Sequence, residues 1–202
     1  MPFEYRPVPA RVAKPADVDA VVGILTAAFF DDPVWGPIFP DRTRRAEQAA
    51  AMWRLYVTSA LRYPWMFLTE GLEAMALWIP PGGTELTDAE TAGLGDFLTE
   101  VAGPQVSADI VRICDQLEEA HPDEPHFYLT LLATHPDHRG RGLGMGLVAT
   151  VLNQVDALGA PAYLESTNPT NLPRYERAGF VPRERITTDA GPVVATMWRP
   201  AR

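Results

Sequence analysis

The chain has 202 residues, of which 47% are hydrophobic and 21% charged, a composition that supports one well-packed domain and excludes general disorder. The formal net charge of −9 gives no evidence of the basic face that nucleic acid or an anionic membrane surface requires; it would attract a cationic substrate, or it could simply aid solubility. The single cysteine, Cys114, excludes an intrachain disulfide and is expected to be a buried, inert thiol. No apolar run approaches the ~20 residues of a membrane span, and no stretch of signal-peptide type occurs, so the sequence predicts a soluble, cytoplasmic protein.

The sequence of the N-terminal half predicts alternating strands and helices. Residues 1–8 hold two prolines and no apolar period and are expected to form an extended arm. The periodicity and the proline and glycine positions then predict a strand at 10–13, a helix from 15 that stops at 31–33, an aromatic and proline-rich loop at 35–40, a helix at 43–63, a hairpin of strands at 65–69 and 72–79, and helices at 88–101 and 106–120.

The C-terminal half continues the alternation. It predicts a strand at 127–132, a loop from 135, a helix at 143–158, a strand at 162–166, a short helix at 172–178, and strands at 180–188 and 193–198 around a turn at 189–192. No repeat and no long linker interrupts the pattern. The sequence therefore predicts one α/β domain over residues 9–202 with a mixed sheet.

Glycines and arginines cluster between a strand and an amphipathic helix, in the sequence RGRGLG at residues 139–144. A helix N-terminus has free backbone N–H groups and a partial positive charge, and glycines let a phosphate approach that backbone closely. Two arginines add charge, a local exception in an acidic chain. The segment therefore predicts a cradle for a pyrophosphate group.

The same segment could hold a different phosphate ligand or none. The P-loop pattern requires a Gly-Lys-Ser/Thr ending, and no lysine is present there. The dinucleotide pattern requires a third glycine where Met145 or Leu147 stands, although Glu165 lies about 20 residues further on, at the distance of a ribose-binding acid. A glycine-rich turn without a ligand is the remaining alternative.

The segment resembles the cofactor motif of the GCN5-related N-acetyltransferase (GNAT) family: Arg or Gln, two residues, Gly, one residue, and Gly or Ala. Arg139, Gly142 and Gly144 match it. A second block at residues 168–180 resembles the family's ending, in which a tyrosine, here Tyr175, precedes a Gly-Phe pair. Within the family, residues 125–129 and 164–177 resemble puromycin N-acetyltransferase-like enzymes, which the N-terminal half matches only loosely.

The resemblance implies a single GNAT-like domain with a mixed, mostly antiparallel central sheet flanked by helices. It implies an N-acetyltransferase that uses acetyl-CoA and no metal. The acceptor would be the primary amine of a small molecule, with an antibiotic or aminonucleoside, and hence antibiotic resistance, among the candidates. A protein or peptide N-acetyltransferase and a non-catalytic acyl-CoA sensor are the alternatives. We expect no nucleic acid or membrane partner, and either a monomer or a homodimer.

The resemblance also assigns the acetyl-CoA site. In the family the strand before the cofactor loop splays at a bulge, and its backbone pairs with pantetheine and can hold the thioester carbonyl. The N–H groups of the loop hold the pyrophosphate. An asparagine could touch the pantetheine arm, although Asn171 could instead only cap a helix. The implied cofactor-binding residues are Leu132, Ala133, Thr134, Arg139, Gly140, Arg141, Gly142, Leu143, Gly144, Asn168 and Asn171.

Tyr175 is the candidate general acid. Acetyl transfer from a thioester expels a thiolate, and a phenol with a pKa near ~10 is protonated at neutral pH and can donate to the sulfur. The alternative is that Tyr175 packs in the core. Glu165, at the end of a strand, is the candidate base that takes the proton of the amine directly or through water, unless the bound amine loses its proton to water without a dedicated base.

The acceptor site is predicted from charge and aromatic residues. Asp31 and Asp32, beside Trp35 and Phe39, could hold a cationic acceptor, or they could only solvate a helix end and a loop. The loop His135-Pro-Asp-His also offers metal-ligand side chains, but it is interpreted as a solvated turn because zinc chemistry needs converging ligands with further support.

Overall fold

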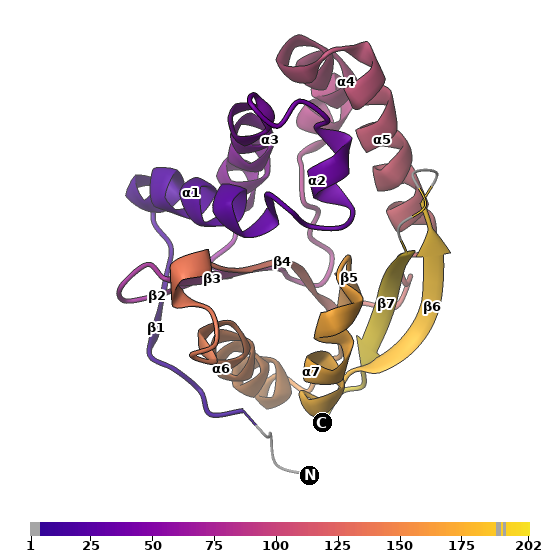
Figure 1. Ribbon diagram of the computed structural model, residues 1–202. Helices are drawn as coiled ribbons and strands as arrows, with labels where there is room; N and C mark the ends of the chain where they lie inside the picture. The colour runs from indigo at the N-terminus through magenta and orange to yellow at the C-terminus, as the bar shows by residue number, and fades with distance from the viewer. Residues whose placement is uncertain (1–4, 189–190, 192) are drawn as a thin grey trace.

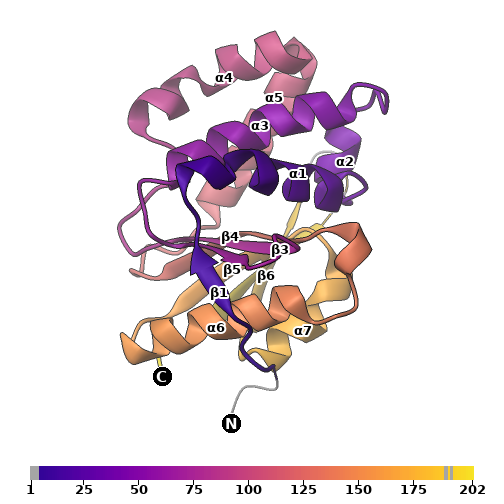
Figure 2. The same ribbon diagram turned by 90° about the vertical axis from the view of Figure 1, so that its left-hand side faces the viewer.

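The computed structural model describes residues 5–188, 191 and 193–202. The first four residues of the predicted arm and three residues of the predicted turn at 189–192 lie outside the described residues. One helical layer consists of α1 (Val18–Phe29), α2 (Trp35–Ile38), α3 (Arg45–Ala60), α4 (Asp88–Ala102) and α5 (Pro104–Glu119). The opposite layer consists of α6 (Leu143–Ala157) and α7 (Leu172–Arg177). A sheet lies between the two layers, as Figures 1 and 2 show.

The sheet has seven strands in the order β1-β2-β3-β4-β5-β7-β6. The strands are β1 (Ala10–Val12), β2 (Met66–Thr69), β3 (Ala74–Ile79), β4 (Phe127–Thr134), β5 (Ala162–Ser166), β6 (Val181–Thr187) and β7 (Val193–Arg199). All neighbours are antiparallel except β4 and β5, which α6 connects as a crossover. The sheet is therefore mixed and mostly antiparallel.

Local sequence signals set several element boundaries. Thr87 accepts a hydrogen bond from the Glu90 N–H, and the Glu90 carboxylate accepts one from the Thr87 N–H at 2.8 Å, a capping box that begins α4. Gly103, with a φ of +90°, ends α4, and Pro104 begins α5. Together these residues fold α4 and α5 into an antiparallel pair at one end of the helical layer.

A β-bulge interrupts β4 at Thr130. Leu129 pairs with Trp78 and Leu131 with Leu77, so Thr130 is an extra residue on its strand. A bulge moves the following residues to the opposite face. Accordingly Leu129 packs with α6, whereas Leu131 packs with α1. The bulge lies where β4 and β5 separate, because their last pair is Leu129 with Leu164.

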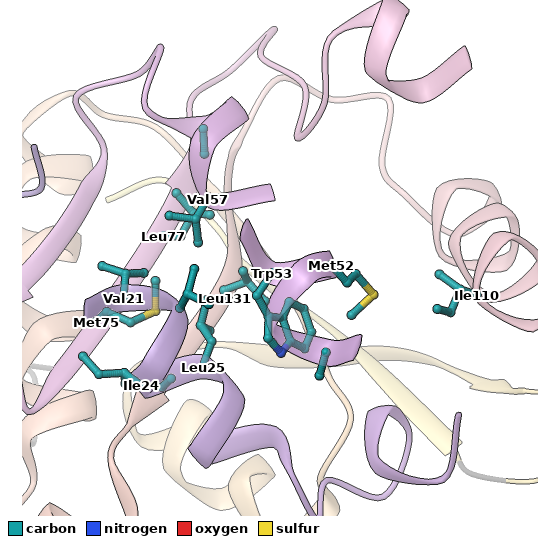
Figure 3. Close-up of a cluster of buried hydrophobic side chains, with 14 of the residues drawn as sticks. Val21, Ile24, Leu25, Met52, Trp53, Val57, Met75, Leu77, Ile110 and Leu131 are labelled. Atoms are coloured by element: carbon teal, nitrogen blue, oxygen red, sulfur yellow. The ribbon is translucent and has the colours of Figure 1, made fainter. Parts of the chain in front are cut away.

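Each face of the sheet has its own hydrophobic core. The larger one lies beneath α1 and α3, and Figure 3 shows side chains of both helices meeting strand residues there: Val21, Ile24, Leu25, Met52, Trp53, Met75, Leu77 and Leu131. The smaller one lies beneath α6. Beside it, fully buried Arg199 of β7 donates two hydrogen bonds, of 2.6 and 2.8 Å, to the Asp156 carboxylate at the end of α6.

The predicted elements are confirmed to within a few residues, with one exception. The sequence predicts a loop at residues 35–40, and this is wrong for the four residues of α2. The Asp32 carboxylate accepts hydrogen bonds from the N–H groups of Val34 and Trp35 at 2.9 and 3.1 Å, which closes the first turn of this helix. Within the described ranges, no helix is long and apolar enough to cross a membrane.

Candidate active site

A cavity of about 1360 Å³ lies where β4 and β5 separate. Its wall combines the glycine-rich loop after β4 with residues from the ends of α1, α5 and α7. The predicted cofactor segment and much of the predicted catalytic and acceptor set therefore meet in one space, although they come from both halves of the chain.

The glycine-rich loop has the backbone conformation that a phosphate cradle requires. Gly140 and Gly142 have φ values of +82° and +75°, which favour glycine, and a Cβ at either would meet nothing within 4 Å. Gly142 precedes α6, whose first N–H groups, at residues 143–145, have no acceptor within the helix. These donors fit the pyrophosphate of acetyl-CoA. A Cβ on Gly144 would lie 2.9 Å from Thr134 Oγ1, so α6 packs closely on the end of β4.

The two loop arginines have different surroundings. Arg139 lines the cavity and donates a hydrogen bond of 2.9 Å to the Ala28 carbonyl at the end of α1. Arg141 is exposed and is not part of the cavity wall. Arg139 thus joins the loop to the opposite helical layer, and the phosphate contacts predicted for both arginines stay predictions.

The end of β4 presents backbone groups to the cavity. Leu132, Ala133 and Thr134 all line it, and they pair with β3 on one side only. Pairing with β5 stops at Leu129, so the other edge of these residues has no strand partner in the described sheet. This arrangement matches the splayed strand that the resemblance implied, and its N–H and C=O groups fit a pantetheine amide.

Asn168 and Asn171 both line the cavity, but their side chains also have local partners. Asn168 Oδ1 accepts from the N–H and the hydroxyl of Thr170, at 3.0 and 2.7 Å. Asn171 precedes α7 without capping it through its side chain, and its Oδ1 accepts from Arg174 at 2.8 Å. The capping alternative therefore describes the side chain of Asn168 rather than that of Asn171.

Tyr175 is positioned for both of its predicted roles. It lies on α7, is 7% exposed and packs against Phe180, with ring centroids 6.2 Å apart. It also lines the cavity. Burial raises the pKa of Tyr175 to about 12, and the charge of Asp32 also raises it. The hydroxyl therefore keeps its proton at neutral pH, which is the state that a proton donor needs.

Glu165 lies at the end of β5 with both carboxylate oxygens held by tyrosines. Tyr128 donates to Oε2 at 2.8 Å, and Tyr163 donates to Oε1 at 3.0 Å. Burial is the main cause that raises the pKa of both phenols, and the Glu165 charge adds to it, so both stay protonated donors. The carboxylate is thereby fixed in the cavity wall.

Glu85 is a second carboxyl group in this wall, and the sequence does not indicate it. It follows β3 and accepts a hydrogen bond from the hydroxyl of Thr130, the bulge residue. Burial raises the pKa of Glu85 to about 7, and the charge of Glu165 also raises it. No short-range signal marks the pair, because Glu85 and Thr130 are 45 positions apart.

Two histidines lie beyond Glu165 in the wall of the cavity. His121 Nδ1 lies 3.9 Å from Glu165 Oε1, and His121 Nε2 lies 3.1 Å from His126 Nε2. The His121 ring also makes edge contacts with Tyr128 and Tyr163, each at 4.9 Å between centroids. No sequence signal indicates this cluster, since the two histidines occupy a proline-rich loop without a known motif.

The predicted acceptor carboxylates have partners in the structure. Asp31 is 70% exposed and pairs with Arg42 at 2.9 Å. Asp32 Oδ1 accepts from the N–H groups at the start of α2, and Oδ2 accepts from the Thr167 hydroxyl at 2.7 Å, which connects the turn between α1 and α2 to the segment after β5. Both residues line the cavity. Their binding of an amine stays a prediction, and Asp32 is the one whose charge acts on Tyr175.

One of the two predicted aromatic contacts is corrected. Trp35 lines the cavity and packs edge-on against Trp53, with centroids 5.6 Å apart. Phe39 does not line it: this side chain is 1% exposed and belongs to the larger core, because the turn after α2 directs it inward.

Cys114 also lines the cavity, and burial raises the pKa of its thiol to about 12. The described residues contain no group of three or more possible metal ligands.

Comparisons with known proteins agree with this architecture. Residues 110–180 match the model of the acetyltransferase (GNAT) family. Over 195 residues, 88% of this chain and 76% of the relative, the sequence is 25% identical to an uncharacterised N-acetyltransferase of Schizosaccharomyces pombe. A structure named as histone acetyltransferase HPA2 and related acetyltransferase, from Corynebacterium glutamicum, matches with a TM-score of 0.69 and 25% identity over 96% of both chains.

A polyamine N-acetyltransferase of Drosophila melanogaster matches with a TM-score of 0.63 and 17% identity, over 94% of this chain and 98% of that one. At this identity the likeness concerns the fold alone. Together the solved structures confirm the predicted fold, a mixed, mostly antiparallel sheet flanked by helices in one α/β domain.

Proposed function

Since the family model and the solved relatives support a GNAT-family acetyltransferase, we propose that this chain transfers an acetyl group from acetyl-CoA to the primary amine of a small molecule. One observation carries the proposal. The splayed strands join a loop suited to an anionic cofactor and a pair of carboxyl groups suited to a cationic amine within one cavity. When bound, acetyl-CoA supplies an acetyl thioester activated for attack by nitrogen.

The loop and β4 would hold this co-substrate. The N–H groups at residues 143–145 would donate to its pyrophosphate, and the free edge of residues 132–134 would pair with the pantetheine amides. A backbone N–H of the same edge would donate to the thioester oxygen and stabilise the charge that develops there. These groups are held by the bulge and by the close packing of Gly144 on Thr134.

Glu165 would prepare the acceptor. An amine is protonated when free and must lose that proton before its nitrogen can attack. The Glu165 carboxylate, held by Tyr128 and Tyr163, would accept the proton from the bound ammonium group. Glu85, whose pKa of about 7 leaves it partly ionised at neutral pH, would add part of a negative charge on the same wall, which attracts a cation to the cavity.

Tyr175 would complete the transfer as the general acid. The departing thiolate needs a proton, and a phenol that is protonated at neutral pH can supply it. Its position on α7 faces the cavity from the side of the cofactor loop and Asn171. Attack by the amine would therefore be assisted by the carboxylate of Glu165, and departure of the thiolate by the phenol of Tyr175.

The shape of the cavity favours a small acceptor over an extended protein chain. Helix α2 packs against α5, and residues of both helices line the cavity, which favours a bounded site over an open groove. Trp35 and Trp53 supply apolar wall for the body of such an amine. The Drosophila relative is described as forming N-acetylagmatine, so amines of this kind are candidates beside the antibiotics and aminonucleosides that the sequence resemblance suggested.

An acetyl-CoA consumption screen tests the proposal. Polyamines, agmatine, arylalkylamines, puromycin, lysine peptides and a no-amine control would be compared with the wild-type chain. We expect turnover with at least one small amine and none in a Gly142→Asp variant, whose carboxylate would lie against the phosphates and abolish binding of CoA measured by calorimetry. Turnover with peptides alone would favour the protein-acetylating alternative, and CoA binding without turnover on any amine would favour a sensor.

A further inference from the structure

A line of polar groups leads from Glu165 to the surface, and the proposed transfer step does not use it. His121 follows α5, and its side chain is 25% exposed. Its two nitrogens face different partners: Nδ1 faces Glu165 Oε1 at 3.9 Å, and Nε2 faces His126 Nε2 at 3.1 Å. His126 Nδ1 in turn lies 2.5 Å from the Glu124 carbonyl oxygen.

These contacts fix the tautomers of both rings. A carbonyl oxygen only accepts hydrogen bonds, so His126 Nδ1 carries a hydrogen. Burial lowers the pKa of His126, which keeps the ring neutral and leaves its Nε2 as an acceptor. His121 Nε2 must then be the donor to His126. In neutral His121 the lone pair is consequently on Nδ1, the nitrogen that faces Glu165.

We infer that His121 takes the acceptor's proton from Glu165 and releases it to water, as a positioning residue that acts through Glu165. The inference rests on the proposed function. In the first step an ammonium N–H bond breaks and the proton joins a Glu165 oxygen. In the second that O–H bond breaks and an N–H bond forms at His121 Nδ1, giving an imidazolium. The imidazolium then loses a proton to solvent, which restores both groups for the next turnover.

The geometry allows this path with a small movement. A separation of 3.9 Å is longer than a hydrogen bond, so the ring turns towards Glu165 or one water molecule bridges the gap. The edge contacts with Tyr128 and Tyr163 limit the ring to such small movements. His126 holds the far nitrogen and thereby keeps Nδ1 directed to Glu165.

The other titratable groups around His121 do not provide an equivalent path. Tyr128 of β4 and Tyr163 of β5 stay protonated and only donate to Glu165. Glu85, after β3, is bonded to Thr130 and lies within electrostatic reach of His121 and of Glu118 on α5. On β6, Glu184 and Arg183 act on Tyr163, and Arg183 also acts on His126. Among these groups, His121 is the base that faces Glu165.

The decisive variant is His121→Ala, assayed with the amine that the screen identifies. A proton acceptor in solution can replace a missing relay, so kcat should fall on the order of tenfold in dilute buffer and recover as buffer concentration rises at constant ionic strength. MOPS is suitable because its tertiary amine cannot be stably acetylated. The KM for acetyl-CoA should stay at the wild-type value, since the contacts of His121 are with Glu165, His126 and two tyrosines and not with the glycine-rich loop. The exposed Glu119→Gln on the same helix end is the matched control, with unchanged kcat and no buffer dependence.

Two results would overturn the relay while the proposed function stands. One is a His121→Ala enzyme with the wild-type kcat at every buffer concentration. The other is a loss of kcat that no buffer restores, which would indicate a structural role. Nitrogen-15 shifts of the wild-type rings give a readout without turnover: we expect Nε2–H on His121 and Nδ1–H on His126, and the reverse pattern on His121 would refute the path. Absence of turnover in the wild type itself would instead overturn the proposed function and the relay with it.

Discussion

Replacing Glu85 by glutamine should stabilise the protein increasingly as the pH rises. The Glu85 carboxyl has a pKa of about 7 in the folded chain against an ordinary value of 4.5, chiefly because it is buried. The folded chain therefore keeps this proton under conditions in which the unfolded chain has released it. Below the unfolded value the group has no effect on the free energy of unfolding, and between the two values its burial lowers that free energy progressively.

The size of the effect follows from these two pKa values. Between about pH 5 and about pH 8 the wild-type chain should lose about 2–3 kcal/mol of stability through Glu85 alone. Glutamine has no charge at either pH, and its side-chain oxygen can still accept from Thr130. The difference in unfolding free energy between variant and wild type should therefore grow by that amount, or by about 5–10 °C in Tm for a domain of this size.

Urea denaturation at a series of pH values measures this difference. The test compares how the unfolding free energies of the variant and the wild type change with pH, so a constant difference in stability that the amide group introduces does not affect it. Glu119→Gln, at an exposed position on α5, is the control and should shift the wild-type curve equally at every pH. If the Glu85→Gln and wild-type stabilities ran parallel from acid to alkaline pH, Glu85 would be ionised in the folded chain, and the reasoning from its burial would be wrong.

Two further substitutions test the site and the fold. Tyr175→Phe should lower kcat by about 10²-fold or more, with an unchanged KM for acetyl-CoA and intact thermal unfolding, and an unchanged kcat would assign Tyr175 to core packing alone. Asp156→Ala should lower the free energy of unfolding by about 3 kcal/mol, because it removes the carboxylate that accepts two hydrogen bonds from the buried Arg199 guanidinium. Denaturant titration measures this loss, and a change below about 1 kcal/mol would contradict it.

Most of the fold and the cofactor loop can be predicted from residues that are close together in the sequence. Period and capping residues determine where helices such as α4 and α6 begin, and these signals lie within a few residues of each boundary. The glycine-rich segment is predictable for the same reason, because the left-handed conformations of Gly140 and Gly142 are requirements of single positions. The wrong prediction of a loop at α2 also has a local cause. The proline and aromatic composition suggested a loop, but the Asp32 side chain accepts hydrogen bonds from the first N–H groups there and stabilises a helical turn.

The acceptor end of the site depends on contacts that no local pattern contains. Glu85 meets Thr130 across 45 positions, and Tyr128 meets Glu165 across 37. Each of these residues is unremarkable in its own segment, and only the bulge and the splay of β4 from β5 bring them together. The prediction for Phe39 is wrong for the same reason, because burial in the larger core is decided by the packing of α1 and α3.

The cavity contains charged residues of both signs, although the chain as a whole is negatively charged. Arg139, Arg174 and Arg177 line it, and so do Glu85 and Glu165. Burial of the Glu85 carboxyl opposes its ionisation, and an ammonium group beside it would favour its charged form. Acceptor binding would then offset the cost of burial and release a proton.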